Sequence, residues 1–394
     1  MIFESEYSTI GEFGEVIMGM SPKGDTYNEN EKGLPLLNGP TEFGSSHPAP
    51  TLYTTDSKRE SMIGDLIFCV RGSTTGRMNW SNQIYSLGRG VCAIRGKTKT
   101  DTKYIKYVLD VKLNSLLNIA GGGTFPNLKK DDIGDFKIPL LKGRDKLVSI
   151  ISAYDDLIEN NLKRIKLLEQ AAQNIYKEWF VNRRFPDNEN TPIEQETGLP
   201  EGWEEKTVGD YVKIISKGPS LNYEVEKGFP VINQSCIRNG EIELEKIRIA
   251  AELKENKHYC YLKINDILIN SMGQGTLGRV SKNNSISEKY IIHNCITFLR
   301  AKDIYSQVYL YQFISSKEDY FISVSQGSTG QTTLKKSLIE DLDIIIPESN
   351  LLKKYDSIVM PMWNKIGVLK NQNKKLKSAR NILLPRLMNQ TIEV

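Results

Sequence analysis

Two stretches of this chain repeat apolar residues with alternating steps of four and three positions. Such spacing is typical of the seam of a coiled coil rather than of the broader apolar face of a surface helix. Each stretch predicts a helix of roughly 33 residues, about 50 Å long at 1.5 Å per residue. Pro361 lies within the second stretch and is expected to kink that helix or to mark a late start. The first ladder is Leu147, Ile151, Tyr154, Ile158, Asn161, Ile165, Leu168, Ala172, Ile175 and Trp179, and the second is Tyr355, Val359, Met362, Ile366, Leu369, Asn373, Leu376, Arg380, Leu383 and Leu387.

The two ladders align at a constant offset of 208 residues, and each contains one asparagine, Asn161 or Asn373. In a parallel pair each asparagine would face an apolar residue. In an antiparallel pair centred between Asn161 and Ile165, the two asparagines face each other, and a buried Asn pair fixes register. We therefore predict an antiparallel coiled coil; the alternative is that each asparagine points to solvent. The ends expected to meet are Leu147 with Leu387 and Trp179 with Tyr355.

Outside the ladders, short apolar runs are bounded by Gly, Ser, Asn and Thr, as strands are. Examples are residues 65–70 and 266–269, and each half also has one expected amphipathic helix, near Tyr104–Leu117 and Val308–Ser323. The predicted fold class is α+β: two similar, mostly-β globular domains separated by two long helices, with pseudo-twofold symmetry. The expected segments are 1–143 (globular domain 1), 144–185 (helix 1), 186–349 (globular domain 2) and 350–394 (helix 2).

The two halves form an internal repeat, because short sequence motifs (called words below) occur in the same order along both halves. Gly-Asp and Leu-Lys-Lys are common words, but chance does not explain their shared order. The matches are Gly11-Glu12-Phe13 with Gly209-Asp210-Tyr211, residues 33–38 with 228–233, Asp65-Leu66-Ile67 with Asp266-Ile267-Leu268, Gly76-Arg77 with Gly278-Arg279, and Leu128-Lys129-Lys130 with Leu334-Lys335-Lys336.

Composition excludes several protein classes. The 39% apolar and 25% charged residues fit a globular chain, and no apolar run approaches the ~20 residues that a membrane span needs. The acidic N-terminus, Met1 to Glu6, lacks a signal-peptide core, so a cytoplasmic location is expected. Five widely spaced cysteines without a CxxC argue against disulfides and a zinc ribbon. The net charge of +4 does not establish nucleic-acid binding by itself.

Motifs for catalysis, metals and cofactors are weak. The segment Gly273–Gly278 satisfies GxGxxG, but a strand-like sequence follows it where a dinucleotide site needs a helix. The three histidines, His47, His258 and His293, are too isolated to form a metal site. The Asn/Asp-Pro-Pro-Tyr string of amino-methyltransferases is missing. We expect no catalytic residue, metal or cofactor in this chain.

The glycine-rich loops carry the best binding candidates. Arg and Gln side chains read base edges, Ser, Thr and Lys hold phosphates, and glycine lets a backbone approach closely. The alternative is that these loops are ordinary hairpin turns. A further basic stretch, Lys374, Lys375, Lys377 and Arg380, is either a solvated helix face or a contact with DNA or an acidic partner. The DNA-binding candidates are Arg71, Thr74, Thr75, Arg77, Lys129, Gln274, Thr276, Arg279, Thr329, Gln331 and Lys335.

Three further segments complete a resemblance to a known family. They are Leu199-Pro200-Glu201-Gly202-Trp203 before Val208-Gly209-Asp210, the first-helix end at residues 175–186, and residues 156–161 within that helix. Together they resemble the specificity subunit of type I restriction–modification systems over essentially the whole chain. The first half departs by lacking the Leu-Pro-x-Gly-Trp opening.

The resemblance implies a non-catalytic subunit that recognises double-stranded DNA. Each globular domain would be a target recognition domain reading half of a bipartite, asymmetric site, and the helices would set the spacer and dock two methyltransferase subunits. S-adenosylmethionine, ATP and magnesium would bind partner subunits, which methylate adenine or, as restriction subunits, cut DNA. The alternatives are a coiled-coil protein adaptor without DNA specificity and a fused enzyme, whose motifs are missing.

Overall fold

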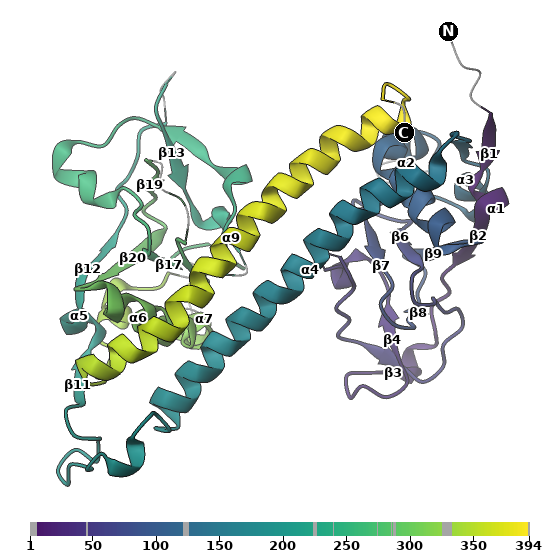
Figure 1. Ribbon diagram of the computed structural model, residues 1–394. Helices are drawn as coiled ribbons and strands as arrows, with labels where there is room; N and C mark the ends of the chain where they lie inside the picture. The colour runs from purple at the N-terminus through teal and green to yellow at the C-terminus, as the bar shows by residue number, and fades with distance from the viewer. Residues whose placement is uncertain are drawn as a thin grey trace. The chain divides into compact units, whose positions relative to one another are not determined.

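The computed structural model describes residues 6–44, 46–120, 126–223, 227–238, 240–273, 275–284, 286, 289–324 and 333–392. The chain forms two compact units (Figure 1). Unit 1 contains Met1–Asn161 and Gln372–Val394, and unit 2 contains Leu162–Asn371. Each unit combines one globular domain with part of each long helix. The boundary between the units therefore falls inside both helices. The division into four consecutive segments stays a prediction.

The domain of unit 1 is built on two four-stranded sheets. The first has the order β2 (Gly14–Met18), β9 (Val91–Gly96), β6 (Leu66–Cys69), β7 (Met78–Trp80) and is antiparallel. The second has the order β3 (Tyr27–Asn28), β5 (Tyr53–Thr54), β4 (Leu34–Leu37), β8 (Ser86–Leu87), with β4 and β8 parallel. Strands β1 (Tyr7–Thr9) and β10 (Lys137–Pro139) also pair. The helices are α1 (Ile10–Phe13), α2 (Lys99–Leu117) and α3 (Lys130–Gly134).

The domain of unit 2 repeats this topology. Its antiparallel sheet has the order β12 (Val212–Lys217), β20 (Ile296–Ala301), β17 (Ile267–Asn270), β18 (Val280–Lys282). A second sheet has the order β16 (Arg248–Ala250), β13 (Phe229–Ile232), β19 (Ile291–Ile292), again with one parallel pair, β13 and β19. Strand β11 (Glu204–Thr207) pairs with β21 (Asp343–Ile346), and β14 (Ile237–Arg238) with β15 (Glu241–Ile242). The helices are α5 (Val208–Tyr211), α6 (Ile304–Ser315), α7 (Glu318–Val324) and α8 (Lys336–Glu340).

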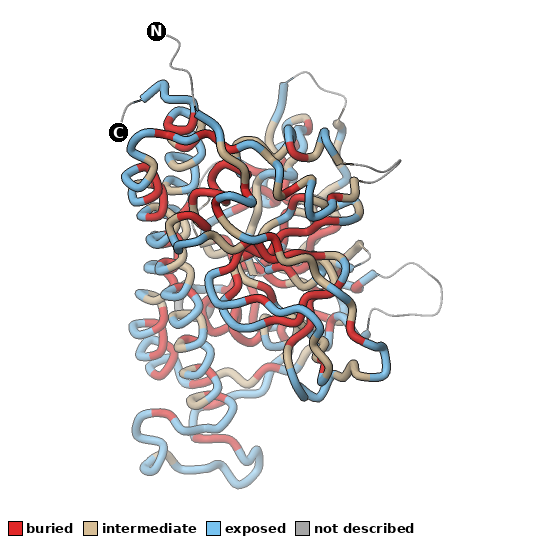
Figure 2. Tube along the Cα trace, turned by 90° about the vertical axis from the view of Figure 1, so that its right-hand side faces the viewer, coloured by how far each residue is buried: buried red, intermediate tan, exposed pale blue. Residues whose placement is uncertain are grey.

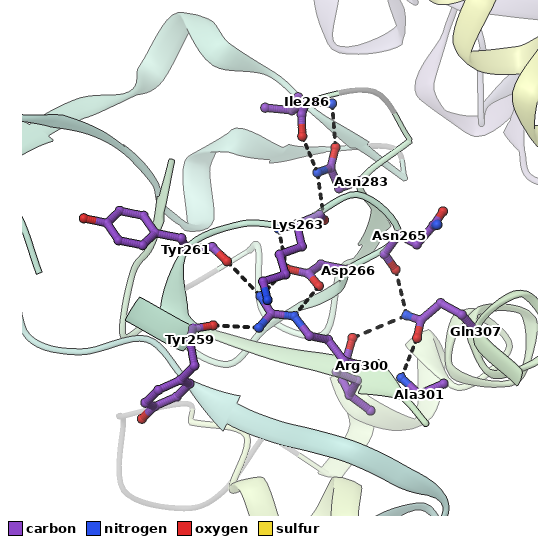
Figure 3. Close-up of polar contacts among 11 residues, drawn as sticks. Tyr259, Tyr261, Lys263, Asn265, Asp266, Asn283, Ile286, Arg300, Ala301 and Gln307 are labelled. Atoms are coloured by element: carbon purple, nitrogen blue, oxygen red, sulfur yellow. Dashed lines mark hydrogen bonds and ion pairs between the residues drawn. The ribbon is translucent and has the colours of Figure 1, made fainter. Parts of the chain in front are cut away.

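A buried ion pair explains why the Asp-Leu-Ile and Asp-Ile-Leu words recur at the start of β6 and β17. In unit 2, Asp266 accepts two hydrogen bonds from Arg300, at 2.6 and 2.7 Å, and one from the Lys263 amide at 2.8 Å (Figure 3). In unit 1, Asp65 accepts two bonds of 2.8 Å from Arg95. Each arginine lies on the strand next to its aspartate, so the pair ties two neighbouring strands at a point where the aspartate is buried.

The two long helices pair antiparallel in each unit. Helix α4 spans Arg144–Tyr176 and continues as a π-helical turn, Lys177–Val181, while α9 spans Ser349–Met388. Asn161 Nδ2 donates to Asn373 Oδ1 at 2.9 Å, and both side chains are buried. The predicted register is confirmed, and the solvent-facing alternative is wrong. Because each buried amide finds its partner in the other, the pair satisfies polar atoms that any shifted register would leave unpaired.

The ladder residues line this helix pair as predicted. Leu147 and Leu387 share the core of unit 1, and in unit 2 the rings of Trp179 and Tyr355 lie 5.9 Å apart. Leu376 is only partly buried. Further seam residues are Ile151, Ile158, Ile165, Val359, Ile366 and Leu369, all buried, and Leu168, which is partly buried.

Two sequence predictions about helices are wrong. The segment near Val308–Ser323 is not one amphipathic helix, since α6 ends at Ser315 and α7 begins at Glu318. Residues 308–314 are all buried, because α6 packs between the sheet of its domain and the long helices. Helix α9 starts twelve residues before Pro361 and runs through it without interruption (Figure 1). Packing against the unit 2 core compensates for the hydrogen bond that proline cannot donate.

Each unit has its own apolar core, and Figure 2 marks the buried residues along the chain in red. In unit 1, β2, β6, β9 and α2 pack with the start of α4 and the end of α9. In unit 2, Phe180 is the centre of an aromatic cluster with Tyr176, Trp203, Tyr309 and Tyr355. No helix in the described part of the chain is both long enough and apolar enough to cross a membrane.

Candidate functional site

The glycine-rich turn between β6 and β7, residues 71–77, is named glycine loop 1. The backbone of Arg71 pairs with that of Asn127, and the Arg71 Nε donates to the Asn127 side chain at 3.0 Å. The Thr75 hydroxyl lies 2.8 Å from the carbonyl oxygen of Gly72 and 3.1 Å from that of Pro126, and its single proton can be donated to either. Two chain segments, 71–77 and 126–129, therefore form one surface, and Lys129 lies at the end of the second, where α3 begins.

Glycine loop 2 is the equivalent turn of unit 2, residues 271–279. The backbone of Met272 pairs with Thr333, as Arg71 does with Asn127. Lys335 precedes α8 as Lys129 precedes α3. The repeat thus places the Leu-Lys-Lys word beside a glycine loop in both units.

Glycine is required at the end of both loops. Gly76 has φ +94° and Gly278 has φ +83°, a conformation that residues with a side chain rarely adopt. A Cβ atom at Gly76 would lie 2.9 Å from the Leu113 side chain of α2, and one at Gly278 would lie 2.9 Å from Ile322 of α7. Each loop therefore packs against a helix of its own domain. This packing fixes the backbone position of the arginine that follows the glycine.

The predicted binding side chains differ in how free they are. Arg71, Arg77, Lys129 and Lys335 are exposed. Arg77 Nη1 donates to the Pro40 carbonyl at 3.3 Å, and its guanidinium lies over the Phe43 ring at 6.0 Å. Such an arginine is oriented but still presents most of its donors to solvent.

Other candidates hold the loops in shape. Thr74, Thr75 and Thr276 are half-buried, and the Thr276 hydroxyl donates to Gly273 at 3.2 Å. Arg279 is also half-buried, and it donates to the carbonyl oxygens of Ile237 and Gly275, at 3.4 and 2.8 Å. Gln274, Thr329 and Gln331 lie outside the described residues.

An acidic side chain accompanies Arg279. Burial raises the pKa of Glu318, while its bond from the Val280 amide and the nearby Arg279 favour the charged form. In loop 2 the positive charge of Arg279 is therefore partly compensated by the nearby Glu318. Within the described ranges, neither Arg71 nor Arg77 of loop 1 takes part in an ion pair.

Sequence reasoning missed the short segments that flank each loop. In unit 1, the 3-10 helix Pro40–Glu42 accepts the hydrogen bond from Arg77, and Thr41 is exposed beside it. In unit 2, the 3-10 helix Gln234–Cys236 receives a bond of 3.0 Å from Asn270. A signal was available, because both segments follow the repeated words at 33–38 and 228–233.

The GxGxxG segment does not have the context of a dinucleotide site. After Gly278 and Arg279 the chain enters strand β18 rather than the helix that such a site needs. In the described part of the chain, no three His, Cys, Asp or Glu side chains gather closely enough to hold a metal ion.

A second candidate surface lies on the long helices. In unit 1, Asp155 of α4 accepts a hydrogen bond from Tyr107 of the domain, and Leu384 of α9 is buried in the domain core. Leu157 and Ile382 each lie two residues away, about 200° around the helix, and both are more than half exposed. They define the outer helix face of unit 1.

The same arrangement occurs in unit 2. Lys370 of α9 forms an ion pair with Glu241 of the domain at 3.0 Å, and Lys370 also contacts Glu169 of α4 at 3.3 Å. Val368 lies two residues from Lys370, and Leu167 lies two residues from Glu169; both are more than half exposed. They define the outer helix face of unit 2. Large apolar side chains left in solvent on a helix opposite its packed side are typical of a docking surface.

Comparison with known proteins gives the same picture. Residues 4–170 and 200–378 match the family model described as type I restriction modification DNA specificity domain. The specificity subunit of type I restriction enzyme MjaIX from Methanocaldococcus jannaschii is 29% identical over 306 residues, covering 74% of this chain and 66% of that protein. The putative MjaX specificity subunit from the same organism is 32% identical over 164 residues, 41% of this chain and 38% of that protein. The match thus spans just under two thirds of the first relative and about two fifths of the second.

A solved structure shares the fold. The S subunit of a type I restriction-modification system from M. genitalium has a TM-score of 0.59 and 16% identity, covering 98% of this chain and 96% of that one. Since the family model matches both halves, over most of the length, the chain belongs to the family of type I restriction–modification DNA specificity domains and carries two copies of that domain.

Proposed function

We propose that this chain is the DNA-recognition subunit of a type I restriction–modification complex, in which each globular domain reads one half of a bipartite, asymmetric site. One observation carries the proposal: two domains of the same topology present equivalent glycine loops with different side chains. Loop 1 offers exposed Arg71 and Arg77, whereas loop 2 offers Thr276 and the half-buried Arg279. A common scaffold with divergent loops suits the reading of two different half-sites.

The chemistry belongs to partner subunits in this proposal. The chain itself supplies the DNA sequence specificity, while two methyltransferase subunits bind S-adenosylmethionine and methylate adenine. Restriction subunits with ATP and magnesium cut unmodified DNA. Mapping of methylated adenines in DNA exposed to the chain and its methyltransferase should yield one asymmetric motif of two parts. Methylation without any sequence motif would instead support the protein-adaptor alternative.

Loss of Arg71 or Arg77 should weaken DNA binding by domain 1. An arginine that contacts a guanine edge contributes about 1–3 kcal/mol of discrimination, so Arg71→Ala and Arg77→Ala should each weaken binding of the mapped site roughly five- to hundredfold. The measurement is a fluorescence-anisotropy titration of the complex with methyltransferase, repeated at several salt concentrations. Arg59→Ala is the matched control, since Arg59 is an exposed arginine of the same domain outside glycine loop 1. Equal effects of the three variants would contradict the loop assignment.

The outer helix faces are proposed to dock the methyltransferase subunits, one on each unit. Their apolar side chains would be buried by an apolar partner surface. The double change Leu167→Glu and Val368→Glu in unit 2 would place two charges in that interface, each costly to bury. We expect at least a hundredfold loss of affinity for one of the two methyltransferase copies, measured as a fall from two copies to one by native mass spectrometry.

A matched control is available on the domain surface. Ile264 is also more than half exposed but lies in the loop before β17. Ile264→Glu should leave two methyltransferase copies bound. Retention of both copies by the double variant would show that docking uses another surface.

A further inference from the structure

Three side chains of unit 1 join its domain to both long helices. Tyr107 of α2 donates its hydroxyl to Asp155 Oδ2 of α4 at 2.9 Å. Arg380 of α9 donates to the other oxygen, Asp155 Oδ1, at 2.6 Å. A single carboxylate therefore connects three helices that lie far apart in the sequence. We call these three residues the carboxylate junction.

The junction has the features of a rigid tie. Tyr107 is almost completely buried, and burial together with the neighbouring Asp155 raises its pKa, so the hydroxyl keeps its proton and donates. Both contacts involve a charged group, and such hydrogen bonds are short and about twice as strong as neutral ones. Arg380 occupies a seam position of the ladder, where an apolar residue is the usual choice. For Arg380 the sequence left open a solvated helix face or a contact with DNA or an acidic partner, and the structure instead pairs it with Asp155 of the same chain.

Unit 2 has no counterpart of the carboxylate junction at the equivalent, described positions. At the offset of 208 residues, Trp363 replaces Asp155, and Ala172 takes the place of Arg380. Trp363 instead packs edge-on against Tyr311 of α6, with ring centroids 5.0 Å apart. At this position domain 2 is held by apolar contacts, whereas domain 1 is held by directional bonds. Domain 2 does have polar contacts with both helices, the ion pairs of Lys370 with Glu241 and Glu169, but they lie seven residues further along α9 than Trp363 and involve more exposed carboxylates.

We infer that Asp155 is a positioning residue that sets the orientation of domain 1 on the helix pair, and through it the half-site separation that the protein accepts. The inference rests on the proposed function. Its physical basis is that a hydrogen-bonded carboxylate has narrow angular tolerance. Loss of a hydrogen bond in the carboxylate junction should let domain 1 adopt a wider range of orientations relative to α4. It should not unfold the domain, because the apolar contacts of Leu147, Val148 and Ile151 with the domain core remain.

The first test needs no DNA. Tyr107→Phe conserves volume and removes only the hydroxyl, and the freed Asp155 oxygen can bind water because its side chain is 22% exposed. Nitroxide labels at Glu60→Cys and Asn160→Cys, both exposed and both in unit 1, report the angle of the domain relative to α4. The five native cysteines are buried and should not take label. Pulsed electron–electron double resonance should show one narrow distance in the parent protein and a clearly broader distribution in the Tyr107→Phe variant.

Asp156→Asn is the matched control. Asp156 is the next residue of the same helix, its side chain is 68% exposed, and its ion pair with Lys103 is long, at 3.8 Å. Loss of this carboxylate should leave the distance distribution narrow. A Tyr107→Phe distribution as narrow as that of the control would overturn the inference.

The second test measures spacing. A DNA library holding the mapped half-sites at separations one base pair shorter and longer than the native one is methylated by the complex. We expect the preference for native spacing to fall roughly tenfold in Tyr107→Phe and Asp155→Asn, as for loss of one charge-assisted hydrogen bond, and to persist in Asp156→Asn. If all variants still methylate the two-part motif with an unchanged preference for its native spacing, the inference is refuted, while the proposed function stands. The absence of any motif in the parent complex would refute the proposed function itself, while the distance measurement still decides on the junction.

Discussion

Replacement of Arg300 by methionine should destabilise unit 2 by about 3–5 kcal/mol, because it leaves a buried carboxylate without its cation. Asp266 is only 1% exposed, and Arg300 supplies two of its three hydrogen bonds. Arg300 also donates to the carbonyl oxygens of Tyr259 and Tyr261, at 2.7 and 2.8 Å (Figure 3). Methionine fills the space of the aliphatic stem but satisfies none of these acceptors. Urea-dependent hydrogen exchange, read separately in peptides of each unit, measures the loss.

The repeat provides an internal comparison for this prediction. Arg95 forms the equivalent pair with Asp65 in unit 1, but its side chain is 28% exposed, against 11% for Arg300. Water can reach Asp65 more readily, so Arg95→Met should cost less, about 1–3 kcal/mol. Equal losses in the two units would show that burial does not control the energy of this pair. Loss of exchange protection in the unit that was not mutated would show that the units do not unfold independently.

Replacement of Lys282 by methionine should remove a stability change at alkaline pH that the parent protein shows. Lys282 is buried, and its Nζ has no hydrogen-bond partner among the described residues. It lies over the rings of Tyr311 and Trp363, at 5.9 and 5.5 Å. Burial lowers its pKa to about 8 from an ordinary 10.5, opposed by the nearby Asp356. One pKa unit corresponds to about 1.4 kcal/mol, so the cost of the buried charge is roughly 3 kcal/mol.

The sign of the effect follows from proton linkage. Between pH 8 and 10.5 the unfolded chain holds the Lys282 proton while the folded chain has released it, so this group makes stability rise with pH. Below pH 8 both states are charged, and the full cost is present. The stability advantage of Lys282→Met over the parent should therefore be largest near pH 7 and shrink by about 2–3 kcal/mol towards pH 10.5.

The difference between the two proteins isolates Lys282, because all other titrating groups are shared. Urea unfolding followed by tryptophan fluorescence suits this measurement, since Trp179, Trp203 and Trp363 all lie in unit 2. An advantage that stays constant from about pH 7 to pH 10.5 would contradict the lowered pKa. A parent protein that is more stable than the variant at neutral pH would show that the ring contacts outweigh the cost of burial.

Lys282 and Trp363 also show how the two copies of the domain diverged on a common fold. Lys282 pairs with Ile267 across β18 and β17, as Trp80 pairs with Leu66 across β7 and β6, and Trp363 takes the place of Asp155 at the offset of 208 residues. At each of these two positions, one copy therefore carries an aromatic residue where the other carries a charged one. The two domains are attached by different chemistry, although their antiparallel sheets have equivalent strand orders.

The sequence by itself determined the duplication, the strand-rich domains, the two long helices and their antiparallel register. Periodicity carries this information because the seam of a helix pair repeats along the chain, and Asn161 and Asn373 report the one register in which buried amides meet. The word repeats likewise predicted the glycine loops, because Gly76 and Gly278 occupy backbone conformations that few other residues adopt.

Only the tertiary structure decided which polar side chains are free and which are engaged. Arg77 and Arg279 occupy equivalent positions of the repeat, yet Arg77 is exposed and Arg279 is half-buried against its own loop. Arg380 and Asp155 are separated by 225 residues, so no local pattern could pair them. The break between α6 and α7 also depends on distant packing. Local spacing specifies backbone periodicity, whereas the partner of a charged side chain is set by whichever segment the fold brings within hydrogen-bonding distance.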